Sequence, residues 1–561
     1  MVIALLLAST LPLGLGAALM AADRLGRPLS HTAAWCIALL TAAASLGAGL
    51  AAAMGDAVVD RPWVPQIGLR LHLTIDGISA PLVVLAAAVT LLAVAVSSRQ
   101  RPKGTPGLFY GSLLVVLGAA VAAFTVRDVI GFFIAFEVAL VPMWVLIDRF
   151  GEAAPTERRR AGWMFALYTV GGSMLMLAGL LVLVAATGTS DLDHLTTAAH
   201  HLPFTTTLIA ATLISVGLAV KVPLLGVHAW LPRAHTAAPT AGSMMLAAVL
   251  LKLGTYGFVR LVALPMPDAW RRIAPIVAIR AVAGIIVGGL VCLVEHDLKR
   301  LVAWSSIAHM GFVMLALAAG QVIGFGAALY GNIAHGVVSA LLFAIVGALK
   351  ARRGPVDVDA PALGLRDTDP RLGFALVVGV AAAFGLPGLA GFWGEILALF
   401  AAWDAPSRPN TLFHVLTALA ALGAVLAAVY GARVLRAVWA GDLDDDARRA
   451  AVDDARRATA NAASDAAAQP GARSTELGAK SAGASAFGAT AFDDTSDDAS
   501  ATASTATASS ADGAAAMQRV TGAEWLAIGV LTLATIALGL VPSPLMHLMN
   551  DELVTLLGGV K

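Results

Sequence analysis

Long apolar runs dominate the sequence and constrain its fold more than any other feature. A helix that crosses a bilayer needs about 20 apolar residues, and about 14 such runs follow one another along the chain. Only 13% of the residues are charged, roughly half the usual share in a soluble domain. Because lipid offers the backbone no hydrogen-bond partner, each run must satisfy its own peptide groups as a helix. We therefore predict an all-α transmembrane fold.

The predicted spans can be placed by residue number. They centre on residues 3–22, 33–54, 78–97, 108–126, 128–148, 161–186, 206–226, 239–262, 273–294, 299–319, 323–349, 371–400, 411–439 and 523–545. Basic residues gather in the loops after odd-numbered spans, as at Arg158, Arg159 and Arg160, and are rarer in the other loops. Since cytoplasmic loops carry an excess of Lys and Arg, we expect both termini to lie outside.

A polar, low-complexity segment separates the last two spans. Residues 441–520 are rich in Ala, Ser, Thr and Asp and hold few large apolar side chains. Such a segment cannot bury enough apolar surface to offset its ordering entropy. We predict a disordered cytoplasmic loop, an insertion without chemistry, with a docking or regulatory tail as the alternative.

At least four charged residues lie inside apolar runs: Glu137, Lys221, Lys252 and Glu395. A charge at the centre of a bilayer costs about 2.5–3.5 kcal/mol on insertion scales, so such residues usually have a function. A lysine suits a proton relay because burial lowers its pKa, whereas a nearby carboxylate raises it. Two alternatives stay open: Glu137 and Lys221 could form a static ion pair, and Lys252 could extend its side chain to the membrane surface.

Three histidines accompany these charges. His228, His309 and His335 lie in or beside apolar spans, and histidine changes charge near neutral pH. Each of them alone is more simply explained as a hydrogen-bonded core residue. Together with the four charges, they favour a hydrated polar path through the membrane.

Spans 7 and 12 are predicted to be broken helices. Pro223 and Gly226 interrupt the first, and Pro387 and Gly388 interrupt the second, with residues 227–238 as a half-helix that completes span 7. Paired interruptions are typical of inverted-repeat transporters. We predict two inverted five-helix repeats, and the alternative is two proline kinks that serve only packing. The predicted parts are residues 1–105 (helices 1–3), 106–264 (helices 4–8), 270–440 (helices 9–13), 441–520 (the loop) and 521–561 (the last helix and the C-terminus).

Two long motifs resemble a known family. They are KVPLLGVHAWLPRAHTAAP at residues 221–239 and DLKRLVAWSSIAHMG at residues 297–311. Both are similar to signatures of the antiporter-like subunits of respiratory complex I and of multisubunit cation/proton antiporters, over about residues 75–440. Glu395, in GFWGE, stands where sister subunits usually place Lys, so the pattern looks most like subunit M. The chain departs from the family pattern at residues 295–297, which read Glu-His-Asp.

The resemblance implies that the chain is a proton-translocating subunit of a NADH-quinone oxidoreductase. The protein would be a multi-pass protein of the bacterial inner membrane, and its partners would be neighbouring antiporter-like subunits and peripheral subunits. It implies a role for each of the polar residues within the spans. They are the coupling pair Glu137 and Lys221, the central relay Lys252, the intermediate stations His309 and His335, the terminal group Glu395, and His228 beside the broken seventh helix.

Redox motifs are missing from the sequence: we find no Rossmann fingerprint, no cysteine cluster and no haem motif. We therefore expect no cofactor in this chain, with FMN, iron–sulfur clusters and quinone in partner subunits, and no nucleic-acid partner. One alternative is a subunit of a Na⁺/H⁺ antiporter or of a membrane-bound hydrogenase. The other is a membrane scaffold whose charges are static.

Overall fold

The computed structural model describes residues 1–55, 57–64, 69–98, 105–359, 364–405, 408–441 and 520–558. These residues belong to one compact unit, which the contacts define as Met1–Leu443 with Arg519–Lys561. The predicted loop at residues 441–520 lies, apart from its two end residues, outside the described residues.

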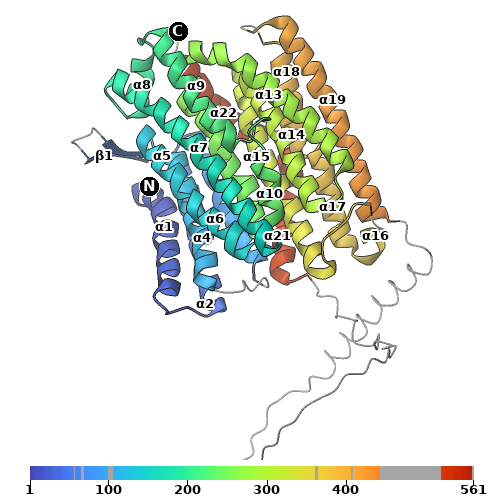
Figure 1. The fold of residues 1–561 in the computed structure, drawn as a ribbon. Helices are drawn as coiled ribbons and strands as arrows, with labels where there is room; N and C mark the ends of the chain where they lie inside the picture. The colour runs from blue at the N-terminus through green and yellow to red at the C-terminus, as the bar shows by residue number, and fades with distance from the viewer. Residues whose placement is uncertain are drawn as a thin grey trace, which may run out of the picture. The chain divides into compact units, whose positions relative to one another are not determined.

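The described chain is a bundle of helices (Figure 1). The first half contains α1 (Val2–Arg24), α2 (His31–Ala53), α3 (Ser79–Val96), α4 (Pro106–Thr125), α5 (Val129–Val138), α6 (Leu140–Phe150), α7 (Pro155–Thr187), α8 (Leu192–Ala199), α9 (Phe204–Lys221), α10 (Trp230–Ala237), α11 (Thr240–Met245), η2 (Leu246–Leu250), α12 (Leu251–Gly257) and η3 (Phe258–Ala263). The second half contains α13 (Pro267–Val294), α14 (Leu298–Ala319), α15 (Val322–Arg353), α16 (Leu365–Thr368), α17 (Pro370–Ala383), α18 (Ala390–Trp403), α19 (Asn410–Val434), η4 (Leu435–Ala440), α21 (Gly522–Leu540) and α22 (Ser543–Gly558).

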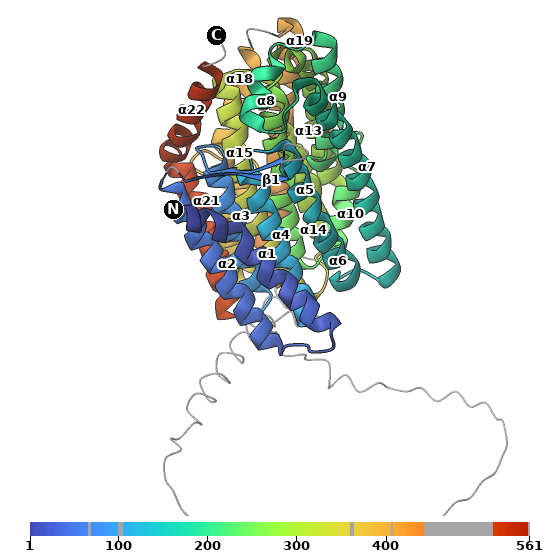
Figure 2. The same cartoon turned by 90° about the vertical axis from the view of Figure 1, so that its left-hand side faces the viewer.

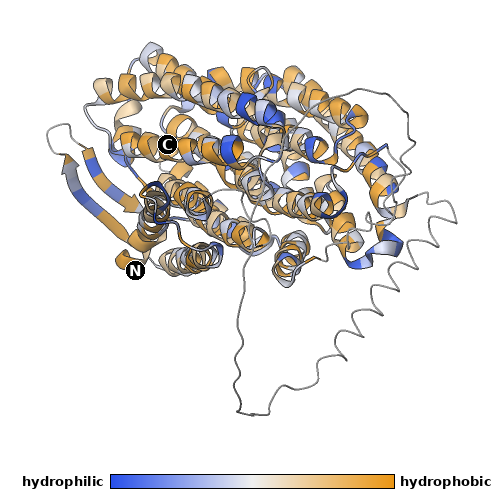
Figure 3. Cartoon of the chain, turned by 60° about the horizontal axis from the view of Figure 1, so that its bottom comes forward, coloured by the Kyte–Doolittle hydropathy of each residue, from blue (hydrophilic) through white to orange (hydrophobic). Residues whose placement is uncertain are grey.

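The prediction of an all-α transmembrane fold with about 14 spans is confirmed. In the described part of the chain, 13 helices are long and apolar enough to cross a membrane. The shorter apolar helices α17 and α18 together occupy the range predicted for span 12. Figure 3 shows hydrophobic colour along most of the helices, and large apolar side chains remain exposed on their outer faces, including Leu40, Leu167, Phe374, Leu422 and Leu533. These side chains are placed to contact lipid.

Both predicted breaks are present. Helix α9 ends at Lys221, two residues before Pro223, and α10 begins at Trp230. Helix α17 ends at Ala383 and α18 begins at Ala390, with Gly385 and Gly388 both at positive φ between them. A proline has no N–H to donate, and glycine adopts positive φ without strain. The two sequence signals therefore end these helices where expected.

The fold also contains a β-hairpin, which the sequence did not predict. Strands β1 (Val58–Val64) and β2 (Leu69–Thr74) pair antiparallel between α2 and α3. Figure 1 shows β1 beside α1 and α4 at one edge of the bundle, Figure 2 shows the hairpin on the side that faces the viewer, and Figure 3 shows that much of it is hydrophilic. The strands are too short and too polar to stand out beside the apolar runs.

The loops fall on two sides as alternating membrane crossings require. The hairpin and the loops after α4 and α7 meet through the bridges Leu73↔Val126 and Asp128↔Asp191. The loops after α13 and α15 meet through the bridge Asp297↔Asp357. The hairpin and the loops after α4 and α7 follow predicted spans 2, 4 and 6, and the loops after α13 and α15 follow predicted spans 9 and 11. Loops after even-numbered spans thus contact one another, and so do loops after odd-numbered spans, as the predicted span count requires.

Candidate functional site

Lys252 lies at the centre of the bundle. Its span, Thr240–Ala263, is buried along its whole apolar window, and its side chain is fully buried. A π-helical turn, η2, precedes it, and the Lys252 Nζ donates to the Ala247 carbonyl in that turn at 2.9 Å. π-Turns occur often at functional sites because they free backbone groups. The alternative in which Lys252 extends to the membrane surface is wrong, because the side chain points into the protein.

His335 on α15 is the direct partner of Lys252. The Lys252 Nζ lies 2.6 Å from His335 Nδ1, and His335 Nε2 lies 3.1 Å from the hydroxyl oxygen of Ser339. Helix α15 is also buried along its whole apolar window. Both ring nitrogens of His335 therefore have a partner, and the lysine and the imidazole are close enough to exchange a proton.

His309 and Glu395 continue this contact chain. His309 Nδ1 on α14 lies 2.9 Å from Glu395 Oε1 on α18, and the His309 and His335 rings are 5.9 Å apart between centroids. His309 Nε2 is buried and has no hydrogen-bond partner among the described residues. Four of the predicted residues thus form two bonded pairs, Lys252–His335 and His309–Glu395, whose imidazoles face each other across a gap.

A cavity opens at this gap. It has a volume of about 30 Å³ and is lined by polar groups of His309, His335, Ser339 and Glu395, among apolar side chains. One water needs about 10–15 Å³ of such space and two or more polar partners. The cavity therefore has room and hydrogen-bonding groups for water that bridges the two imidazoles.

Glu395 lies over the break in span 12. A Cβ added at Gly385, which has φ +70°, would meet Glu395 Oε2 at 2.6 Å. A side chain there would displace the carboxylate from its present position. The broken helix thus provides the position from which Glu395 reaches His309.

Glu137 and Lys221 form a second, separate location. Glu137 stands one residue before the end of α5, and Pro142 lies in the first turn of α6. A proline ring disrupts the bond to the carbonyl four residues earlier, which explains the interruption at Ala139. Lys221 ends α9 and is 2% exposed, and its Nζ lies 4.4 Å from the centroid of the Phe136 ring.

The Glu137–Lys221 pair is not a closed ion pair. The two side chains act on each other electrostatically, yet they form no direct salt bridge, and both Glu137 Oε1 and Lys221 Nζ are buried without hydrogen-bond partners among the described residues. This geometry does not support the static ion-pair alternative. Gly254, two residues after Lys252, packs against Lys221, since a Cβ there would meet Lys221 Cβ at 3.2 Å.

His228 lies in the break of span 7, outside the chain of contacts described above. The Gly226 N–H donates to His228 Nδ1 at 3.1 Å, and the ring lies 5.5 Å from the Trp304 ring. The structure thus places it beside the broken helix and against α14.

Sequence reasoning missed His235, although it stands in the quoted motif. Its ring on α10 is fully buried, both nitrogens lack partners among the described residues, and it stacks on Phe343 at 4.6 Å. Lys299 and Lys252 both act on it electrostatically. A buried titratable group without hydrogen bonds between two lysines is a candidate for proton transfer.

Two charge clusters at opposite ends of the bundle were also missed. Asp76, before α3, pairs with Arg127 and Arg260. Burial acts to raise the pKa of Asp76, but these arginines hold it well below its usual range. At the other end, Glu152 Oε2 lies 3.0 Å from Lys299 Nζ and 2.8 Å from Lys350 Nζ. Each cluster joins residues far apart in sequence, so no local pattern could reveal it.

Burial acts to raise the pKa of Glu152 as well, but the charges of Lys299 and Lys350 and their hydrogen bonds lower it overall. The same carboxylate accepts the backbone N–H of Thr240 at 2.9 Å, and Lys299 also donates to the Ala238 carbonyl at 2.6 Å. The cluster therefore fixes the junction between α10 and α11, next to His235.

The comparisons with known proteins agree on one family. The model of the NADH:quinone oxidoreductase/Mrp antiporter transmembrane family matches residues 126–421. NAD(P)H-quinone oxidoreductase chain 4 1 of Synechococcus sp. (strain JA-3-3Ab) is 35% identical over 382 residues, which are 68% of this chain and 72% of that protein. Chain 4 2 of Microcystis aeruginosa is 36% identical over 383 residues, 68% of each chain.

Solved structures share the fold. A chain of respiratory complex I from Thermus thermophilus with bound NADH superposes with a TM-score of 0.75 at 24% identity, over 99% of both chains. A chain of the Mrp complex from Dietzia sp. DQ12-45-1b gives a TM-score of 0.74 at 21% identity, over 98% of this chain and 52% of that one. The sequence motifs, the family match and the chain 4 relatives lead to one assignment: the chain belongs to the NADH:quinone oxidoreductase/Mrp antiporter transmembrane family, as an antiporter-like subunit of the chain 4 (subunit M) type.

Proposed function

We propose that this chain translocates protons as a membrane subunit of a respiratory NADH-quinone oxidoreductase. The observation that carries the proposal is the line of contacts from Lys252 through His335 and His309 to Glu395, with a water-sized cavity between the imidazoles. Buried ionisable groups inside a membrane bundle are typical of proton paths. The chain 4 relatives are named as parts of NAD(P)H-quinone oxidoreductases.

The energy source lies in other subunits. We propose that FMN, iron–sulfur clusters and quinone are held by partner chains, and that the neighbours in the membrane are further antiporter-like subunits. A signal from those neighbours would reach the Glu137–Lys221 pair, where Glu137 Oε1 and Lys221 Nζ are buried without hydrogen-bond partners among the described residues. A change in the distance between them would alter how strongly Lys221 holds its proton.

Three finer features belong to the same proposal. Residues 106–264 and 270–440 form two related five-helix units, supported by one interrupted span in each. The N-terminus lies outside, supported by the basic residues in the loops after odd-numbered spans. Glu395 is the far end of the path in this subunit, because it lies at the broken span 12 and beyond His309.

The test is proton pumping by the assembled complex with Glu395→Gln. We expect the complex to assemble, and the number of protons pumped per NADH oxidised to fall, because the amide cannot take up a proton at this position. Glu157→Gln, on an exposed residue at the start of α7, is the matched control and should pump normally. Normal pumping by an assembled Glu395→Gln complex would overturn the proposed path, and purification of the chain without any redox subunit would overturn the assignment to an oxidoreductase.

A further inference from the structure

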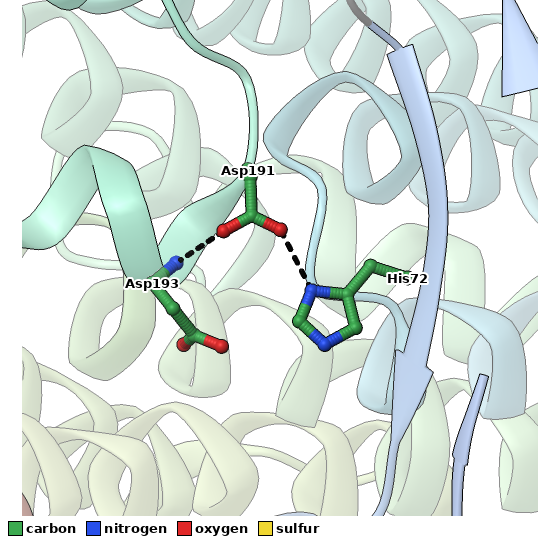
Figure 4. A group of neighbouring side chains, drawn as sticks. All are labelled: His72, Asp191 and Asp193. Atoms are coloured by element: carbon green, nitrogen blue, oxygen red, sulfur yellow. Dashed lines mark hydrogen bonds and ion pairs between the residues drawn. The ribbon is translucent and has the colours of Figure 1, made fainter. Parts of the chain in front are cut away.

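A histidine and two aspartates meet outside the membrane spans, away from the proton path. His72 lies on β2, Asp191 is the N-cap of α8, and Asp193 lies in the first turn of α8. Figure 4 shows the three side chains gathered at one place. One ligand atom from each lies within 4.8 Å of the others.

Asp191 is held in position by the start of its helix. Its Oδ1 accepts the backbone N–H groups of Asp193 at 3.2 Å and His194 at 3.1 Å. Its Oδ2 is thereby turned toward His72 Nδ1, 2.7 Å away. A carboxylate whose orientation is fixed by hydrogen bonds of this kind is what well-ordered metal sites use.

Among the described ion pairs, Asp191 has no direct contact with a permanently charged side chain, and Arg70 acts on it electrostatically without forming an ion pair. The Asp191 side chain is 3% exposed, and its ion-pair partners in the described part of the chain are His72 and His194 alone. A buried carboxylate is costly unless a cation compensates its charge. A bound metal ion would supply that charge.

We propose that His72, Asp191 and Asp193 bind a divalent transition metal ion of the Zn²⁺ type. Mixed imidazole and carboxylate ligands suit Zn²⁺ and its neighbours, whereas Ca²⁺ and Mg²⁺ prefer oxygen alone. The two carboxylates balance the two charges of the ion. Metal–ligand bonds of about 2.0–2.1 Å at tetrahedral angles separate two ligand atoms by about 3.3 Å, so His72 and Asp191 must move apart only slightly.

The remaining ligands can close around the ion from solvent. The Asp193 side chain is 58% exposed and the His194 side chain is 80% exposed, so both can turn without disturbing the core. His194 Nδ1 already lies 3.2 Å from Asp191 Oδ1, which makes it the available fourth ligand. Two imidazoles and two carboxylates complete a tetrahedral site.

Arg127 is the one cation that competes for the site among the described ion pairs. Its guanidinium lies 3.8 Å from Asp193 Oδ1, a loose contact, and it also pairs with Asp76. Capture of Asp193 by a metal ion therefore leaves Arg127 with its buried partner. Metal binding at this site is therefore compatible with the charge cluster of Asp76, Arg127 and Arg260.

The test is titration of the chelator-treated, full-length chain in detergent with Co²⁺, whose visible absorption reports tetrahedral coordination. We expect one Co²⁺ per chain, displaced by Zn²⁺. Asp193→Asn should weaken binding by about tenfold or more, and His72→Gln by more than that, since even the partners of ligands are worth about 10–100-fold. Asp193→Asn is decisive because this exposed side chain contributes little to folding.

A matched control comes from a second group of the same kind, His296, Asp357 and Asp359, which is exposed on all three residues. His296→Ala should leave the Co²⁺ spectrum and affinity of the chain unchanged. Two results would overturn the proposal. One is wild-type affinity in Asp193→Asn, and the other is a wild-type chain that binds no Co²⁺.

Discussion

Lys252 and His335 form the closest contact between two titratable residues of the proposed path, at 2.6 Å. When the Lys252 ammonium donates to His335 Nδ1, the other ring nitrogen carries the proton and donates to Ser339. Transfer of the Lys252 proton to the ring would make the imidazole cationic in a buried place, where burial disfavours charge. A carboxylate farther along the path, Glu395, is placed to draw that proton onward through His309.

Replacement of Lys252 by Met tests this step. Met keeps an unbranched apolar stem of similar length and removes the ionisable group, so packing should be largely retained. We expect proton pumping by the assembled complex to fall on the order of 10²-fold, the low end of what a positioned proton donor contributes. The measurement is the proton-to-electron ratio in proteoliposomes, with His414→Gln, at the stacked Trp403–His414 pair, as control. Wild-type pumping in Lys252→Met would contradict the role.

His235 allows proton transfer and structural roles to be separated. Both of its nitrogens are buried without partners among the described residues, and an unsatisfied buried polar group costs about 1–3 kcal/mol. His235→Phe preserves the stacking on Phe343 and removes that cost. We expect the thermal unfolding midpoint to be unchanged or higher and proton pumping to be lower. A variant that is both stable and fully active would exclude His235 from the path.

At the scale of helices, the sequence predicted the interruptions that proline and glycine cause, at Pro223 and between Gly385 and Gly388. It did not predict the interruption at Ala139, although Pro142 follows Glu137 by only five residues in the sequence. The π-turn before Lys252 was also missed, because an extra residue in a helical turn leaves no mark in an apolar run. The π-turn matters through a contact that only the folded structure shows, because it presents the Ala247 carbonyl to Lys252.

The break in span 12 permits a matched pair of glycine substitutions. Gly385 and Gly388 both have positive φ, at 70° and 87°, so an alanine at either should cost about 1–2 kcal/mol of backbone strain. A Cβ at Gly385 would also meet Glu395 Oε2 at 2.6 Å, whereas a Cβ at Gly388 would meet only Leu540, at 3.7 Å. We expect both variants to unfold at lower temperature, and Gly385→Ala alone to lose pumping beyond that destabilisation. Equal pumping in the two would show that the carboxylate position is not critical.

At the scale of the whole molecule, the functional residue types and the number of spans were predictable from the sequence, but the contacts between those residues were not. Hydropathy marked the spans, and the cost of intramembrane charge marked Glu137, Lys221, Lys252 and Glu395. Which of them touch depends on helix packing, and the structure pairs Lys252 with His335 while leaving Glu137 and Lys221 apart. The clusters around Asp76 and Glu152 escaped prediction because their members come from different loops and helices.

Glu152 connects the two proposed five-helix units. It accepts hydrogen bonds from Thr240 in the first unit, and from Lys299 and Lys350 in the second. The Lys299 side chain is 6% exposed and that of Glu152 is 22% exposed, so solvent screens their interaction only in part. Removing one partner of such a cluster leaves charge of one sign uncompensated, which costs about 3–5 kcal/mol in buried pairs.

Glu152→Gln should therefore destabilise the chain at neutral pH, with a lower unfolding midpoint in detergent, while Glu157→Gln should not. The difference between Glu152→Gln and wild type should also depend on pH. The pKa of Glu152 is lowered in the folded state, so its stabilising effect is fully present above the ordinary glutamate value of about 4.3 and is lost as the pH falls through the folded value. The two unfolding midpoints should converge only as the pH falls through this lowered folded value, because wild-type Glu152 is then neutral like the amide. A constant difference across this range would mean that the cluster stabilises the chain through shape rather than charge.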